Sequence, residues 1–105
     1  MTSTNVDRRR WQLRNLRVIE SLIHDHDLPV MIWTVSPFGI NGQPSATSNA
    51  ERRAAVESWA RVLGATWWTP YVDAEITTLR ASAKDYQGVT ILLRTVLFGD
   101  DSADQ

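Results

Sequence analysis

The sequence predicts an α+β fold in which an N-terminal helix is followed by the order β-α-β-β-β. Two segments carry apolar residues at helical spacing, a β-branched run lies between them, and two longer apolar runs joined by turn residues follow. We expect one mixed four-stranded sheet with both helices on one face. The 105 residues predict a single domain, 1–105, with residues 1–7 and 99–105 as disordered tails.

Two helices are predicted from periodicity and from their end signals. The first begins near Arg8 and stops by about Asp27, because Pro29 disfavours helical geometry at the residue before it. Its expected apolar face consists of Trp11, Asn15, Leu16, Val18, Ile19, Leu22 and Ile23. The second helix covers residues 49–63, since Ser48 and Glu51 form a capping box and Gly64 suits a left-handed C-terminal cap.

Four strands are predicted around these helices. Residues 30–35 are apolar on both faces, which is typical of a central strand covered on both sides. A loop over residues 36–47 follows it. Residues 66–69, 74–82 and 89–98 are expected to form an antiparallel meander, with Pro70 ending the first of these strands and Gly88 in a left-handed or bulged turn.

This arrangement resembles a group of small uncharacterised α+β proteins of streptomycetes and other actinobacteria, including their mobile elements. The resemblance depends on Trp33–Val35, the turn residues Gly39, Gly42 and Gln43, the segment Ser58–Ala65 and the following hairpin, and it extends from about Leu22 to Phe98. It implies the fold described above and brings no function with it.

The composition excludes several classes of function. The net charge is −1, so no global charge attracts nucleic acid or membrane, and the absence of cysteine excludes disulfides and thiolate chemistry. The N-terminus lacks the apolar core of a signal peptide, and no apolar run is long enough to cross a bilayer. These features predict a cytoplasmic protein without membrane contact.

The polar clusters do not predict catalysis. His24–Asp27 holds two imidazoles and two carboxylates, but residues two apart on a helix do not share a face, and no further histidine completes a metal site. Asp73 and Glu75 share one face of a strand without a nucleophile beside them. We therefore expect no catalytic residue, no metal, no cofactor and no enzymatic activity.

The predicted loop and two tryptophans are better suited to recognition. Residues 28–50 contain no charged side chain, and charge depletion with aromatics retained is typical of the core of an interface. Phe38, Ile40 and Gln43 in the loop, with Trp67 and Trp68, are the predicted interface residues, because neighbours in a strand point to opposite faces. The alternative is that Phe38 and Ile40 fold back and cap the sheet.

The last predicted strand suggests what covers the free face of the sheet. It is apolar on both sides, and a second copy of the chain with its sheet stacked across a two-fold axis covers it most simply. The predicted function is thus a non-enzymatic, homodimeric protein-interaction or accessory module, which can also take another protein as partner. The alternative is a nucleic-acid-associated protein that contacts phosphates through Arg10, Arg14 and Arg17 of the first helix.

Overall fold

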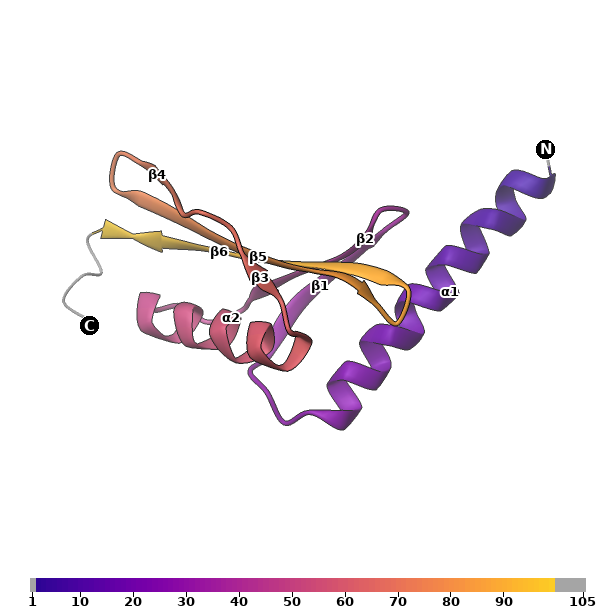
Figure 1. The fold of residues 1–105 in the computed structure, drawn as a ribbon, viewed down its shortest axis with the longest axis horizontal. Coiled ribbons are helices and arrows are strands. Elements are labelled where there is room, and N and C mark those ends of the chain that lie inside the picture. The colour runs from indigo at the N-terminus through magenta and orange to yellow at the C-terminus, as the bar shows by residue number, and fades with distance from the viewer. Residues whose placement is uncertain (1, 100–105) are drawn as a thin grey trace.

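A computed structural model of the chain has an α+β fold with two helices and one six-stranded mixed sheet (Figure 1). It describes residues 2–99, with side chains from Asn5 onward. The elements are α1 (Thr2–Asp25), β1 (Met31–Ser36), β2 (Gly39–Pro44), α2 (Asn49–Leu63), β3 (Thr66–Trp67), β4 (Tyr71–Asp73), β5 (Ile76–Tyr86) and β6 (Val89–Phe98). The α+β class is confirmed, whereas the four-stranded sheet and its element order are wrong in detail.

The sheet has the order β1-β2-β6-β5-β3, and β4 also pairs with β5. β2 and β6 run parallel and every other pair is antiparallel, so β3, β5 and β6 form the predicted antiparallel meander. The predicted loop over residues 36–47 is wrong, because its residues 39–44 form β2, which makes a hairpin with β1 across Pro37 and Phe38. β1 is consequently an edge strand, and not the doubly covered central strand predicted from its apolar sequence.

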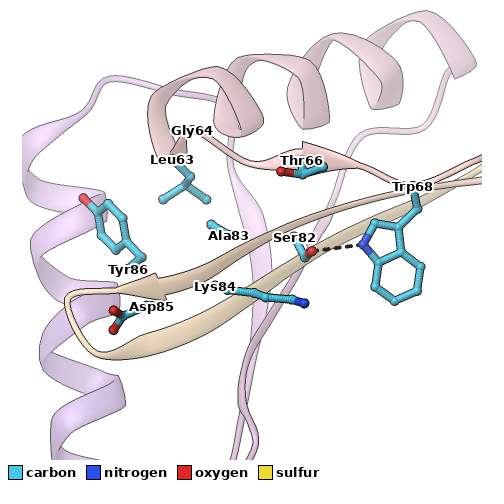
Figure 2. A pocket seen from close by; sticks show the side chains of 9 residues that line it. All are labelled: Leu63, Gly64, Thr66, Trp68, Ser82, Ala83, Lys84, Asp85 and Tyr86. Atoms are coloured by element: carbon cyan, nitrogen blue, oxygen red, sulfur yellow. Dashed lines mark hydrogen bonds between the residues drawn. The ribbon is translucent and has the colours of Figure 1, made fainter.

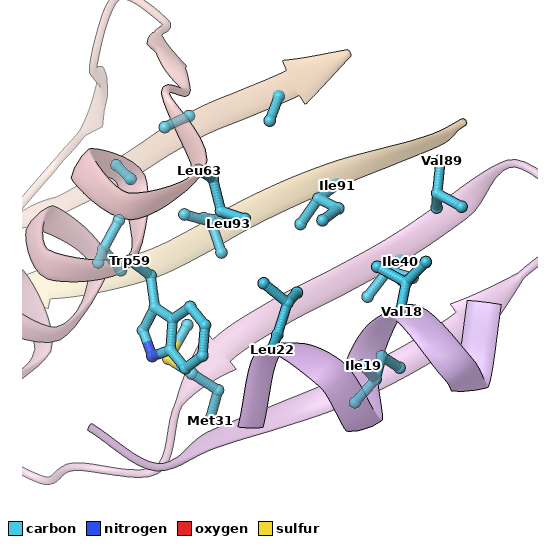
Figure 3. Close-up of a cluster of buried hydrophobic side chains, with 14 of the residues drawn as sticks. Val18, Ile19, Leu22, Met31, Ile40, Trp59, Leu63, Val89, Ile91 and Leu93 are labelled. Carbon is cyan, nitrogen blue, oxygen red and sulfur yellow. The ribbon is translucent and has the colours of Figure 1, made fainter. Parts of the chain in front are cut away.

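Both helices pack on one face of the sheet and share one core (Figure 3). Val18 and Leu22 of α1, and Trp59 and Leu63 of α2, meet the strand residues that point toward them. Those strand residues are Met31, Ile40, Ala81, Ala83, Val89, Ile91 and Leu93. Alternation along each strand therefore leaves the neighbouring side chains on the opposite face, which no element of the described chain covers.

The first helix is longer than predicted. It begins at Thr2, so residues 2–7 are helical and not a disordered tail; the predicted tail over 100–105 lies outside the described residues. Only its second half touches the sheet, and its N-terminal half projects away from the body (Figure 1). The radius of gyration, 15.3 Å, reflects this shape, since a compact domain of this length has about 13 Å.

The second helix has the predicted bounds, with Ser48 as its N-cap and Gly64 as its C-cap. The predicted capping box is formed only in part, because the Glu51 carboxylate accepts from Ser48 Oγ and not from the Ser48 backbone N–H. Ser48 Oγ accepts from the backbone N–H of Glu51 at 3.1 Å, and Gly64 adopts φ 65° and donates to Ala60 and Arg61. Local signals are sufficient here because each cap satisfies backbone groups that the helix itself leaves unpaired.

One glycine in β2 permits the packing beneath it. A Cβ at Gly42 would lie 2.5 Å from the Trp33 ring, so only glycine leaves room for that indole. Trp33 then meets Trp59 edge to face, with centroids 5.2 Å apart. The glycine that suggested a loop in the sequence is thus part of the core.

Candidate functional site

The uncovered side of the sheet, which we call the open face, is the first candidate site. Its side chains include Ile32, Thr34, Asn41, Arg80, Ser82, Lys84, Thr90, Leu92, Arg94 and Val96, the residues that alternate with the core positions. Strands β1, β2 and β6, and β5 as far as Lys84, contain no Asp or Glu. β4 places Asp73 on the same face, opposite Ile76. Three cations against this carboxylate make the open face positively charged, although the protein as a whole is not.

The predicted interface residue Trp68 contributes to this face. Its indole Nε1 donates to Ser82 Oγ at 2.9 Å, and its backbone N–H donates to the Arg80 carbonyl at 2.9 Å. The Arg80 guanidinium stacks over the ring at 4.7 Å from the centroid. Figure 2 shows Trp68 bound to Ser82, with Lys84 farther along the same strand.

The two adjacent tryptophans take opposite sides, as strand geometry requires. Trp67 pairs with Ala81, a core position, and so points toward the helix side, whereas Trp68 bonds to Ser82 on the open face. Their exposed fractions, 45% and 43%, are nearly equal, so each keeps about half of its surface available.

The hairpin between β1 and β2 separates the two predicted apolar contacts. Phe38 lies at its tip and is 91% exposed, while Ile40 is 2% exposed and belongs to the core. The assignment of Ile40 to an interface is therefore wrong, because its side chain points to the helix face. Gln43 is exposed on β2, opposite Ile32. A groove of about 340 Å³ runs from Phe38 across Asn41 and Leu92 to Trp68 and Lys84.

The second candidate site is an apolar row on α1 that sequence reasoning placed partly in the core. Leu16 and Ile23 were expected to be buried, yet they lie on the solvent side with Val6 and Leu13, and these four are 43% to 57% exposed. We call these four residues the outer stripe. The core is contacted from the other side of α1, by Asn15, Val18, Ile19 and Leu22.

The sequence carries a signal for this outer stripe. Val6, Leu13, Leu16 and Ile23 are separated by seven, three and seven residues, which is the a/d spacing of a coiled-coil seam. The outer stripe was not separated from the core-facing row in the sequence pattern, because the two rows lie next to each other on the helix. Asn15 marks the true inner side: it is fully buried and donates to the Ser36 carbonyl at 3.0 Å, which fixes α1 on β1.

The arginines proposed for phosphate contact also share one side of α1. Arg10, Arg14 and Arg17 recur at four and three residues and are exposed, so the helix brings them together on one flank. Arg14 also donates to the Asn15 side chain at 3.4 Å.

The polar groups considered for metal or acid–base chemistry are scattered. The described residues contain no cluster of three or more His, Asp or Glu side chains that could hold a metal ion. At the end of α1, hydrogen bonds from His24 and Ser21 lower the pKa of Asp25 below its usual range, at a site open to solvent. This is an ordinary polar helix end.

Neither described helix combines the length and hydropathy needed to cross a membrane. Comparison of the chain with protein families, with curated proteins and with solved structures finds no match. Any function must therefore be argued from the two surfaces described above, the outer stripe and the open face.

Proposed function

We propose that this protein is a non-enzymatic protein-interaction module that works as a homodimer. The observation that supports the proposal is the outer stripe, an apolar row on a projecting helix that no other element of the described chain covers. Such rows are buried when two amphipathic helices pack against each other.

The stripe is complementary to itself in antiparallel orientation. With a two-fold axis between residues 14 and 15, Leu13 of one copy lies opposite Leu16 of the other, and Val6 lies opposite Ile23. Between these two apolar layers, the same register places Arg9 opposite Glu20. A two-fold interface requires such self-complementarity, because both copies use the same surface.

Charge along α1 favours the same orientation. Five arginines lie in the first 17 residues, while Glu20 and Asp25, followed by Asp27, lie toward the other end. An antiparallel pair places the basic half of one helix beside the acidic end of the other, whereas a parallel pair places like charges together. A groove of about 350 Å³ beside Leu13 and Leu16 reaches Val35 and offers room for the partner's leucines.

The homodimer first expected, with two open faces stacked, is disfavoured by charge. Arg80, Lys84 and Arg94 lie on that face in each copy, so stacking would bring three plus three cations together, against Asp73 at the end of β4 in each copy. Like charges that are removed from water repel strongly. We therefore place self-association on α1.

A charge-exchange experiment tests the helix pair. Arg9→Glu alone and Glu20→Arg alone should each weaken dimerisation in sedimentation velocity at micromolar concentration, because each puts like charges opposite one another twice. An equimolar mixture of the two variants should restore a dimer, since every Arg9–Glu20 contact regains opposite charges. A wild-type protein that sediments at 11.9 kDa throughout this range would refute the proposal.

Cross-linking tests the orientation, because the chain has no cysteine of its own. Val6→Cys mixed with Ile23→Cys should form a disulfide-linked pair on mild oxidation. Val6→Cys alone should not, since an antiparallel pair holds the two copies of this residue about 25 Å apart. Efficient cross-linking of Val6→Cys alone would indicate a parallel pair and contradict the proposed register.

A second function is favoured by the flank formed by Arg10, Arg14 and Arg17, which stays outside the outer stripe. It offers three neighbouring cations to a phosphate backbone. If duplex DNA binds there, Arg10→Ala with Arg14→Ala should reduce the dependence of log K on log salt by about 2. Failure of random duplex DNA to shift in a low-salt gel would remove this candidate.

A further inference from the structure

The open face carries cations that make no ion pair with the described residues. Arg80 and Arg94 are directly opposite each other on β5 and β6, an arrangement of like charges that is unfavourable in a sheet. The Nε of Arg80 is shielded from solvent and has no hydrogen-bond partner among the described residues. Buried polar atoms in native proteins are normally paired, so the hydrogen-bonding capacity of the Arg80 side chain is not satisfied by the described residues.

Aromatic surface lies beside these cations and is held in place. The indole of Trp68 is held on the face by its hydrogen bond to Ser82, and its backbone N–H donates to the Arg80 carbonyl. One side of the ring is occupied by the Arg80 guanidinium, and nearly half of its surface remains exposed. Phe38 stands at the other end of the 340 Å³ groove and is almost fully exposed.

We propose that this groove binds single-stranded nucleic acid. Lys84 in the groove, with Arg80 and Arg94 on the open face outside its lining, would contact phosphates, and an unpaired base would stack on Trp68. Sequence-tolerant single-strand binding uses this combination. Asn41 and Thr90, which also line the groove, provide neutral hydrogen-bonding groups between the cations and the aromatic rings. An acidic peptide would neutralise the cations but would leave the aromatic surface without a planar partner, so nucleic acid fits both features.

The site is separate from the outer stripe and from the arginine flank of α1. It is therefore independent of dimerisation, and a monomeric variant such as Arg9→Glu should keep it. The positive charge at this site comes from strand residues, whereas that of the arginine flank comes from α1. Substitutions on the sheet and on α1 therefore distinguish binding at the open face from binding at the arginine flank.

Fluorescence anisotropy with a short labelled oligothymidylate tests the proposal at several salt concentrations. Wild-type protein should bind, with an affinity that falls as salt rises. Lys84→Ala with Arg94→Ala, both exposed positions, should lower the slope of log K against log salt by about 1.4. Trp68→Ala should weaken binding by about tenfold with the slope unchanged, and Trp68→Phe should retain most of the affinity because it still stacks.

Arg53→Ala with Arg61→Ala on α2 is the matched control, since it removes the same charge from exposed positions elsewhere and should change neither affinity nor slope. Loss of binding with Arg10→Ala and Arg14→Ala, but not with the sheet variants, would overturn the site. So would equal competition by inorganic polyphosphate or polyglutamate, because stacking would then contribute nothing. Absence of binding at low salt would overturn it as well.

Discussion

Asn49, the first residue of α2, joins that helix to the far end of the sheet. Its Oδ1 accepts from the backbone N–H of Phe98 at 2.9 Å, and its Nδ2 donates to the Phe98 carbonyl at 2.6 Å. The side chain is 3% exposed, and Arg52 also donates to its Oδ1. One amide therefore pairs with the end of β6 as a neighbouring strand would. We expect Asn49→Ala to destabilise the protein by breaking this pair.

The size of the effect follows from the two lost hydrogen bonds. Each contributes about 1 kcal/mol net, and partial burial of the Phe98 groups hinders water from replacing the amide, so about 2 kcal/mol is expected. For a domain of this size the melting temperature should fall by about 8–16 °C. Asn49→Asp should also destabilise near neutral pH, because a carboxylate oxygen would then face the Phe98 carbonyl.

Thermal denaturation followed by circular dichroism at fixed protein concentration measures both variants. Asn41→Ala is the matched control, since Asn41 is exposed and its loss should change stability by less than about 0.5 kcal/mol. An unchanged melting temperature for Asn49→Ala would refute this reasoning.

Three further predictions concern backbone and packing, each measured as the melting temperature at fixed concentration. Gly42→Ala should destabilise by about 1–3 kcal/mol, because its Cβ would overlap the Trp33 ring; full stability would contradict the role of that glycine. Phe38→Ala should change stability by less than about 0.5 kcal/mol, since the ring is exposed, and a large drop would mean that it caps the core. Ala74→Gly should stabilise by about 0.5–1 kcal/mol, because Ala74 has φ 55°; destabilisation would contradict a strained turn.

Elements whose ends are determined by residues close in the sequence were predictable. The second helix and β6 have the expected bounds, since the caps of the helix and the length of the apolar run depend on neighbouring residues alone. The turn before β6 is similar: Gln87 and Gly88 have φ 51° and 81°, which fits the predicted left-handed Gly88.

The β1–β2 hairpin was not predictable in the same way. Its second strand contains Gly39, Gly42 and Pro44, residues that disfavour a strand and indicate a loop. The strand forms because Ile40 is buried and because Gly42 admits Trp33, and both are tertiary effects. The same limit applies to β1. Its Ile32 is apolar but exposed, so the sequence predicted a central strand where the structure has an edge strand.

The two surfaces differ in how far the sequence could have revealed them. The outer stripe is visible in the spacing of Val6, Leu13, Leu16 and Ile23, once the inner row through Asn15 is recognised as a separate one. The groove and the arginines on the open face are not visible, because Trp68, Arg80 and Arg94 lie far apart in the chain and come to one face only through the pairing of β5 with β3 and β6.

The charges on α1 and on the open face suggest that these two surfaces have different functions. On α1 five arginines and one carboxylate, Asp7, lie in the first 17 residues and Glu20 and Asp25 follow, so an antiparallel copy brings the basic half beside the acidic end. On the open face Arg80, Lys84 and Arg94 outnumber Asp73, the carboxylate that the pairing of β4 with β5 places there, so a second copy is repelled and a polyanion gains. Self-association through α1 thus leaves both open faces available, and a dimer would present two grooves to a single strand.

If one strand spans both grooves, Arg9→Glu should weaken binding to long oligonucleotides but not to short ones, because only the long ones gain from bivalent attachment. Equal loss for long and short ligands would show that the groove depends on dimerisation, against the separation argued here.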